Sequence, residues 1–143
     1  MEPIYDWDAE NRITTCTISD KRGNKYIGIA KCHPDDYDFG NSYTGSMIAL
    51  ERAYMNYLKS IKRNEIQPGL AALKQLYYSI NQSQSYNPNS YESKMLWRQI
   101  RLKQEDLEFI EEELADREQN LKRILAEKEI FYQKIRKARA AKL

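Results

Sequence analysis

Apolar residues recur every seven positions between Ser90 and Leu143, and neither Gly nor Pro interrupts that segment. The repeat predicts one helix over 90–143, about 75–80 Å long at about 1.5 Å per residue, with a coiled-coil seam along one side. Ser90 is suited to cap its start. Because a helix cannot bury its own seam, this segment must pack against something else. The two core positions of the repeat hold Ile100, Leu107, Leu114, Leu121 and Ile135, and Leu96, Ile110, Ile124, Phe131 and Ala138.

The residues before the long helix predict an α+β head over 1–89. β-branched residues on both sides of the turn sequence at 20–24 indicate a β-hairpin, and residues 3–8 are a candidate edge strand that their proline disfavours. Apolar residues at helical spacing then predict two shorter helices. The first of these carries Ala49 and Ala53, two small residues that permit close approach by the hairpin. The predicted elements are a hairpin over 11–33 and helices over 46–63 and 67–81, with a break at Asn64-Glu65.

The two shorter helices cannot cover the whole seam. They would span about 27 Å and about 20 Å, so we expect the head to cover only the first third of the long helix. The part beyond Glu118 would then pack on a second copy of the chain or on another protein. As a third alternative, the helix would break within 115–120, where apolar residues are scarce. The pattern leaves these three alternatives open.

Charge along the long helix is segregated. Residues 105–118 are mostly acidic, whereas residues 122–139 are mostly basic. An antiparallel pair centred near Asn120 would lay the acidic block beside the basic one, while a parallel pair would oppose like charges. We therefore expect a homo-oligomer, with an antiparallel dimer favoured. Its expected interface consists of Leu107, Ile110, Leu114, Leu121, Ile124, Phe131 and Ile135.

Composition narrows the setting in which the protein works. The formal net charge is +2 over 143 residues, which argues against a protein that simply coats nucleic acid. The acidic N-terminal residues lack the apolar stretch of a secretion signal, and no apolar run is as long as a membrane span. Two cysteines do not make a disulfide framework, so a reduced cytosol fits best. The sequence thus predicts a cytoplasmic protein with no membrane partner.

Cys16, Cys32 and His33 are the first candidates for chemistry, and their pattern is weak. Zinc sites need three or four ligands at characteristic spacing, and the chain has no CxxC and one His. If Ser19 faces Tyr26 across the turn, the two cysteines are separated along the hairpin. Adjacent residues at a strand end point to opposite faces, so Cys32 and His33 are poorly placed as a nucleophile and its base. We interpret the cysteines as small buried hydrophobes.

Other catalytic or metal-binding patterns are also weak. An acidic loop could bind a divalent cation, but acidic loops are common. No glycine-rich phosphate loop exists. We therefore expect no enzyme, no catalytic residue, no metal and no cofactor. The acidic loop carries Asp35, Asp36 and Asp38.

Two small groups of cations favour nucleic-acid binding as an alternative. The first lies at the tip of the predicted hairpin, and the second lies beside Trp97 at the start of the long helix. Cations next to an aromatic ring are typical of nucleic-acid contacts, although a few basic residues on a turn are more often simply solvated. The candidate residues are Lys21, Arg22 and Lys25 at the tip, and Arg98, Arg101 and Lys103 on the helix.

Two stretches of the chain carry a family resemblance. The first joins Gly28-x-Ala-Lys-Cys-His-Pro-x-Asp36 to Gly45-x-x-Ile-Ala-x-x-Arg-Ala53, and the second runs from Pro88 to Arg101. Together they resemble uncharacterised small proteins of bacteriophages and of integrated mobile elements in Gram-positive bacteria. The resemblance covers most of the chain and implies a phage-like protein in the bacterial cytosol, without assigning any functional residue.

This context favours a protein that acts by binding. Small phage proteins without active sites usually bind components of phage DNA metabolism or of host defence. We therefore expect protein–protein binding that modulates or inhibits a host or phage nucleic-acid enzyme, with counter-defence such as anti-CRISPR activity as the most concrete form. The acidic block would compete for a basic nucleic-acid channel. Its central residues are Glu111, Glu112 and Glu113.

Overall fold

The structure is a computed structural model, and it describes residues 1–32, 42–82 and 90–142. Its internal contacts divide the chain into two compact units. The first contains Met1–Tyr57 and Ala115–Leu143, and the second contains Leu58–Leu114. The α+β class expected from the sequence is confirmed. Three strands at the N-terminus are followed by helices, and the last of these is the long C-terminal helix.

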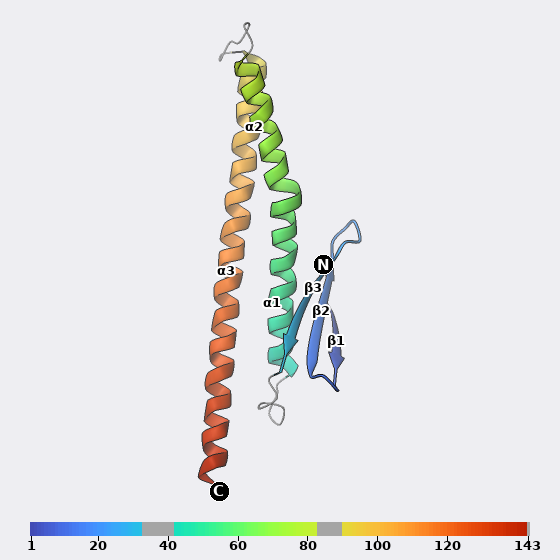
Figure 1. Cartoon of the computed structure of the whole chain (residues 1–143), viewed down its shortest axis with the longest axis vertical. Helices are drawn as coiled ribbons and strands as arrows, with labels where there is room; N and C mark the ends of the chain where they lie inside the picture. Colours follow the sequence, from blue (N-terminus) through green and yellow to red (C-terminus); the bar gives the residue numbers. More distant parts are fainter. Residues whose placement is uncertain (33–41, 83–89, 143) are drawn as a thin grey trace. The chain divides into compact units, whose positions relative to one another are not determined.

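The sheet of the first unit has three antiparallel strands (Figure 1). Strand β2 (Ile13–Ser19) lies in the centre, between β1 (Ile4–Asp8) and β3 (Lys25–Lys31). The predicted hairpin corresponds to β2 and β3, and the candidate edge strand near the N-terminus is present as β1. A two-stranded hairpin alone is only marginally stable in water, and the third strand adds the pairing that stabilises the sheet.

The register of the hairpin differs by one residue from the assumed pairing of Ser19 with Tyr26. Ser19 is opposite Lys25, and Cys16 is opposite Gly28. The cause is the loop at 20–24, where the Asp20 backbone N–H donates to the Asn24 carbonyl at 3.0 Å. The loop is one residue shorter than in the assumed pairing. Because loop length fixes the register of a hairpin, every pair along the two strands shifts by one residue.

Asp20 holds this loop together, and we expect it to make the hairpin sensitive to acid. Its carboxylate accepts the backbone N–H groups of Arg22 and Asn24 at 2.9 Å and the Tyr26 hydroxyl at 3.0 Å. Desolvation alone would raise the pKa of Asp20, but hydrogen bonds from Asn24, Tyr26 and Arg22 outweigh it and hold the pKa below its ordinary value. A lowered carboxyl pKa contributes stability that is present above about pH 4 and lost as the pH falls further.

The prediction is that Asp20→Asn lowers the urea midpoint at pH 7 and that this difference shrinks between pH 4 and pH 2. Circular dichroism of both proteins across that range measures it. Asp6→Asn is the matched control, because Asp6 is an exposed carboxylate outside the loop. An equal loss for the two variants, or a difference that does not change with pH, would contradict the role of Asp20.

Helix α1 (Ser42–Ile61) packs directly on the sheet in the first unit. The approach is closest at Gly28, where an added Cβ would collide with the backbone of Ala49 and Ala53. The small residues expected to permit this approach therefore do so, and the glycine opposite them is equally necessary. The buried core of this unit consists of Cys16, Ile18, Ala30, Ile48, Ala49, Ala53 and Ile124.

Side chains of α1 also close the free edge of β3. The Asn56 amide donates to the Ile27 carbonyl, and the Arg52 guanidinium donates to the Ile29 carbonyl, both at 2.7 Å. These bonds satisfy carbonyl groups that an edge strand would otherwise leave open to another chain. Side chains of α1 therefore cover the β3 edge of the sheet.

The break expected at Asn64-Glu65 is absent. Helix α1 is followed by a π-helical turn, η2 (Lys62–Ile66), and then by α2 (Gln67–Asn81) without a gap. The Gln67 backbone N–H donates to the Lys62 carbonyl, five residues back. Pro68 lies just inside α2 and has no N–H to donate, so a widened turn before it lets helical structure continue. The start of α1 also precedes the predicted residue 46.

Helix α3 (Tyr91–Ala141) is continuous and does not break within 115–120. Ser90 caps it as predicted, because its hydroxyl accepts the Ser93 backbone N–H at 3.2 Å. Within the second unit, the Tyr77 and Trp97 rings lie 5.9 Å apart, and Lys62 pairs with Glu111 at 3.2 Å. These contacts show α3 running antiparallel to η2 and α2 there. In the part of the chain that the structure describes, no helix is long and apolar enough to cross a membrane.

Candidate functional site

The seam residues expected to bind a second copy are partly used within the chain. Ile124 belongs to the core of the first unit, and Ile110 is buried in the second. The expectation that the head covers only the first third of the long helix missed Ile124, because α1 reaches the far half of α3. The other expected interface residues are Leu107, Leu114, Leu121 and Ile135, all half-buried, and Phe131, which is exposed.

The seam shifts by one residue near its far end. Phe131, which the seven-residue repeat places in the core, is 50 % exposed, whereas its neighbour Tyr132 is only 2 % exposed. A straight helix has 3.6 residues per turn, so a strict repeat of 3.5 drifts around it along its length. Phe131 and the adjacent Ile130 are consequently surface residues.

The candidates for chemistry are not brought together in the described residues. Cys16 is fully buried, and burial raises the pKa of its thiol, so it stays protonated and shielded at neutral pH. Cys32 is half-buried and lies just past the end of β3. His33 and the acidic loop at Asp35, Asp36 and Asp38 lie outside the described residues. Within 1–32, 42–82 and 90–142, no group of three His, Cys, Asp or Glu side chains could hold a metal ion.

The two groups of cations belong to different units. Lys21 and Lys25 are exposed on and beside the hairpin loop, as is Arg22, while Arg98 and Arg101 are exposed on α3 in the second unit. Lys103 differs from them, because it is half-buried and its side chain lies beside Gly69 of α2. It therefore packs between two helices and does not extend the basic surface of its neighbours.

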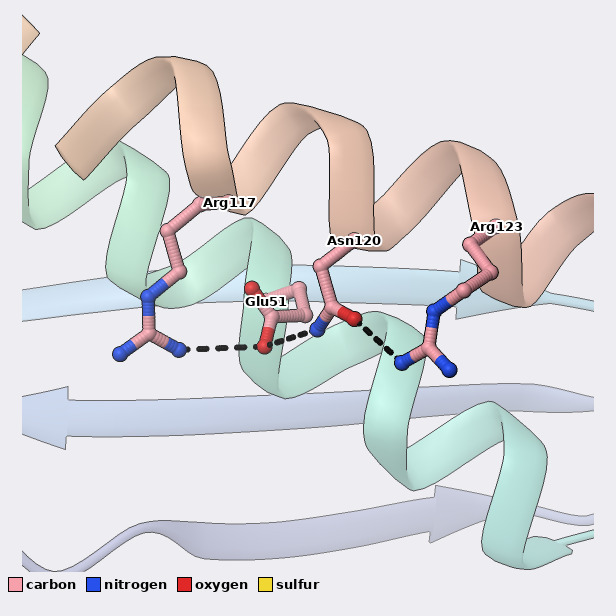
Figure 2. Close-up of polar contacts among 4 residues, drawn as sticks. All are labelled: Glu51, Arg117, Asn120 and Arg123. Carbon is pink, nitrogen blue, oxygen red and sulfur yellow. Dashed lines mark hydrogen bonds and ion pairs between the residues drawn. The ribbon is translucent and has the colours of Figure 1, made fainter. Parts of the chain in front are cut away.

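One ionisable network is buried, and it ties α1 to α3 in the first unit. Glu51 is only 7 % exposed, and its Oε1 accepts from Arg117 and from Asn120, each at 3.1 Å (Figure 2). Asn120 in turn accepts from Arg123 at 2.6 Å. The Arg117 guanidinium also lies 4.6 Å from the centre of the Tyr54 ring. This closed arrangement anchors α3 to α1, and its polar groups point toward one another and leave no open site.

The second unit carries a surface better suited to binding. Phe109 of α3 is 65 % exposed, although a side chain of this size is normally covered. Residues three and four positions away are its neighbours on a helix surface, and all four are acidic. We call this set the acidic–aromatic patch: Phe109 with Glu105, Asp106, Glu112 and Glu113.

The charges of the acidic–aromatic patch are largely unneutralised. Glu105, Asp106 and Glu112 are exposed, and in the described part of the chain none of the three has an ion-pair partner. Glu111, which the sequence also suggested, instead pairs with Lys62. The patch thus presents an aromatic ring beside three exposed carboxylates, those of Glu105, Asp106 and Glu112, a combination that matches a basic protein surface with an apolar pocket.

Sequence reasoning found the acids of this patch and missed its aromatic centre. The available signal was an apolar residue out of phase with the seam, since Phe109 follows the core position Leu107 by two residues. Residues two positions apart point to opposite sides of a helix, so Phe109 faces away from the side on which the seam packs. Leu102, seven residues earlier, is out of phase in the same way and is also exposed.

No family model, curated protein or solved structure matches this chain. Among the candidate sites, the acidic–aromatic patch combines a large exposed apolar group with three exposed carboxylates that have no ion-pair partner in the described residues, those of Glu105, Asp106 and Glu112.

Proposed function

We propose that this protein is a non-enzymatic accessory protein of a bacteriophage or mobile element that binds and inhibits a nucleic-acid enzyme in the bacterial cytosol. The observation that carries the proposal is the acidic–aromatic patch on α3. Its partner would be the basic channel in which such an enzyme holds nucleic acid. Counter-defence against a host nuclease is the most concrete form of this activity.

The chemistry of the patch supports this kind of partner. Enzymes that hold nucleic acid line their channels with Lys and Arg, which neutralise phosphates at close spacing. Carboxylates at successive turns of a rigid helix offer a comparable row of negative charge. Glu105 and Glu112 are two turns apart, which is about 10 Å along the axis. Phe109 lies between them and would supply the desolvated anchor that charge alone lacks.

Inhibition assays with purified nucleases of a Gram-positive host, RNA-guided nucleases included, test the proposal. We expect the full chain to inhibit cleavage by at least one of them, and to do so less well as salt increases. Phe109→Ser should raise the half-inhibitory concentration by about tenfold or more, the typical effect of removing an aromatic anchor. Glu105→Lys with Glu112→Lys should abolish inhibition.

Phe131→Ser is the matched control, because Phe131 is also a half-exposed phenylalanine of α3 but has no acidic ring around it. We expect it to inhibit like the unchanged chain. If Phe109→Ser and Phe131→Ser have the same half-inhibitory concentration, the patch is not the binding surface. Failure to inhibit any nuclease of the panel would remove the proposed function.

Direct nucleic-acid binding remains the rival function, supported by exposed cations on the anchored hairpin loop. Retention of the chain on immobilised DNA or RNA at low salt, lost in a Lys21→Glu, Arg22→Glu variant, would favour the rival. Retention that these substitutions leave unchanged would remove it.

A further inference from the structure

The free edge of β1 is a surface that the proposed function does not use. β1 is the first strand in the order of the sheet, so it pairs with β2 on one side only (Figure 1). The direction of its backbone groups follows from two bonds at the ends of the hairpin. The Cys32 N–H donates to the Arg12 carbonyl, and the Asp20 N–H donates to the Asn24 carbonyl.

These two bonds fix the hydrogen-bonding phase of the sheet. In an antiparallel pair, facing residues alternate between those that exchange hydrogen bonds and those that do not. Arg12 and Asp20 bond toward the β3 side, so the odd-numbered residues of β2 bond toward β1. Their partners in β1 are Ile4, Asp6 and Asp8. The backbone groups of Tyr5 and Trp7 therefore point away from the sheet.

The two edges of the sheet differ in what covers them. By the same alternation, Ile27 and Ile29 point outward from β3, and side chains of α1 bind their carbonyl groups. At β1, the backbone N–H and C=O groups of Tyr5 and Trp7 have no hydrogen-bond partner in the described part of the chain. Both residues thus offer a donor and an acceptor to an added strand.

Side chains on both faces of β1 flank this open edge. Tyr5 and Trp7 lie on the inner face, because they pair with residues of β2 that are buried there. They are nevertheless 43 % and 51 % exposed. Asp6 lies between them on the outer face, is exposed, and has no ion-pair partner among the described residues. An added strand would cover the two rings with alternate side chains and place one residue directly opposite Asp6.

The charge of this segment identifies the kind of strand that fits. Residues 1–11 contain four acidic side chains and neither Lys nor Arg. The Asp8 carboxylate is held in the turn after β1, where it accepts the backbone N–H groups of Glu10 and Asn11. Asp6 is therefore the accessible carboxylate at the centre of the edge. A cation opposite it is favoured, and an acid there is disfavoured.

A second copy of β1 fits this edge poorly. Pairing Tyr5 with Trp7 of the other copy sets Asp6 against Asp6, and pairing Trp7 with Trp7 sets Asp6 against Asp8. Pairing Tyr5 with Tyr5 sets Trp7 against Pro3, whose nitrogen has no hydrogen to donate. Each of these registers opposes like charges or loses a main-chain bond.

We propose that the free edge of β1 binds an extended segment of another protein as a fourth strand, antiparallel to β1. The segment carries Lys or Arg opposite Asp6 and apolar residues opposite Tyr5 and Trp7. Main-chain bonds supply its affinity, and the cation supplies its selectivity. β1 belongs to the first unit and the acidic–aromatic patch to the second, so this proposal does not depend on the proposed function.

Fluorescence anisotropy with a labelled peptide tests the added strand. The probe is Lys-Thr-Val-Lys-Val-Thr-Lys, whose central Lys would face Asp6. We expect saturable binding to the full chain below about 1 mM. The same peptide N-methylated at both Val residues keeps its charge but cannot donate to Tyr5 and Trp7, so it should bind at least about tenfold more weakly. Equal binding of the two peptides, or no binding up to about 1 mM, would overturn the proposal.

A charge exchange tests the position of the cation. Asp6→Lys should weaken binding of the probe about tenfold, because an attractive pair becomes a repulsive one, and should favour a peptide with Glu in place of the central Lys. Asp116→Lys is the matched control, because Asp116 is an exposed acid on α3 of the same unit. Equal weakening by the two variants would show attraction by net charge alone and would overturn the proposal.

Proline substitutions test the hydrogen-bonding phase. Trp7→Pro removes an N–H that points to the free edge, so this variant should stay folded by circular dichroism and lose the probe. Asp6→Pro removes an N–H that bonds to β2, so it should lower the urea midpoint. A folded Trp7→Pro chain that still binds the probe would contradict the proposal. A dimer of the unchanged chain that Trp7→Pro dissociates in sedimentation would identify a second copy as the occupant and would also overturn it.

Discussion

Gly28→Ala is expected to unfold the first unit or to destabilise it by at least about 3 kcal/mol. The added methyl group would lie well inside contact distance of the Ala49 carbonyl oxygen and the Ala53 nitrogen. Both are backbone atoms of α1, so no rotation of a side chain relieves the collision. The helix would have to lift from β3, which would also break the hydrogen bond from Asn56 to the strand edge. Urea denaturation followed by circular dichroism measures the loss.

Gly69→Ala provides the matched control, because Gly69 lies inside α2 and its added Cβ would be 3.5 Å from the Lys103 Cε, an ordinary contact. Alanine is favoured over glycine within a helix by about 0.5–1 kcal/mol, so this variant should gain stability. A Gly28→Ala protein as stable as the unchanged chain would show that α1 does not contact β3 so closely.

Arg117→Met is expected to destabilise the protein by about 3 kcal/mol. Arg117 is the cation paired with Glu51, whose carboxylate is almost fully buried, and Asn120 alone cannot neutralise it. Within the described residues the second oxygen of Glu51, Oε2, has no hydrogen-bond partner, which makes this carboxylate more dependent on Arg117. Thermal and urea unfolding of the full chain measure the effect.

A double-mutant cycle separates the ion pair from the packing of its side chains. Replacing both Glu51 and Arg117 with Met removes both charges and leaves apolar groups of similar size, so it should cost less than Arg117→Met alone. Arg123→Met is the control, since Arg123 contacts the network only through Asn120 and is mostly exposed. A double variant that loses as much as the sum of the singles would contradict coupling between Glu51 and Arg117.

Local signals in the sequence predicted the individual elements well. The turn residues at 20–24 indicated the hairpin, and Ser90 marked the start of α3 where its hydroxyl caps the helix. The uninterrupted repeat beyond Ser90 indicated a single long helix, because strong helix formers and the absence of Gly and Pro act over a few residues. The same repeat identified Ile100, Ile110 and Ile124 as inward-facing, and all three are buried.

The errors arose where distant residues decide the outcome. Asn64 and Glu65 looked like a helix end, yet a π-helical turn carries the backbone past Pro68. The segment at 115–120 has few apolar residues, yet it is held by a glutamate far back in the chain. Phe109 was overlooked because its exposure is visible only once the packed side of α3 is known.

The sequence by itself determined the α+β class, the presence of the hairpin, the long helix and the phase of its seam as far as Ile124, since these depend on propensities and periodicities within short stretches. Only the tertiary structure decided which surfaces the elements share. It placed Ile124 in the chain's own core and Gly28 against α1, and it left Phe109 and the outer face of the sheet exposed. The physical reason is that burial requires two surfaces in contact. A periodic pattern identifies the apolar face of one element, but it does not identify the surface that covers this face.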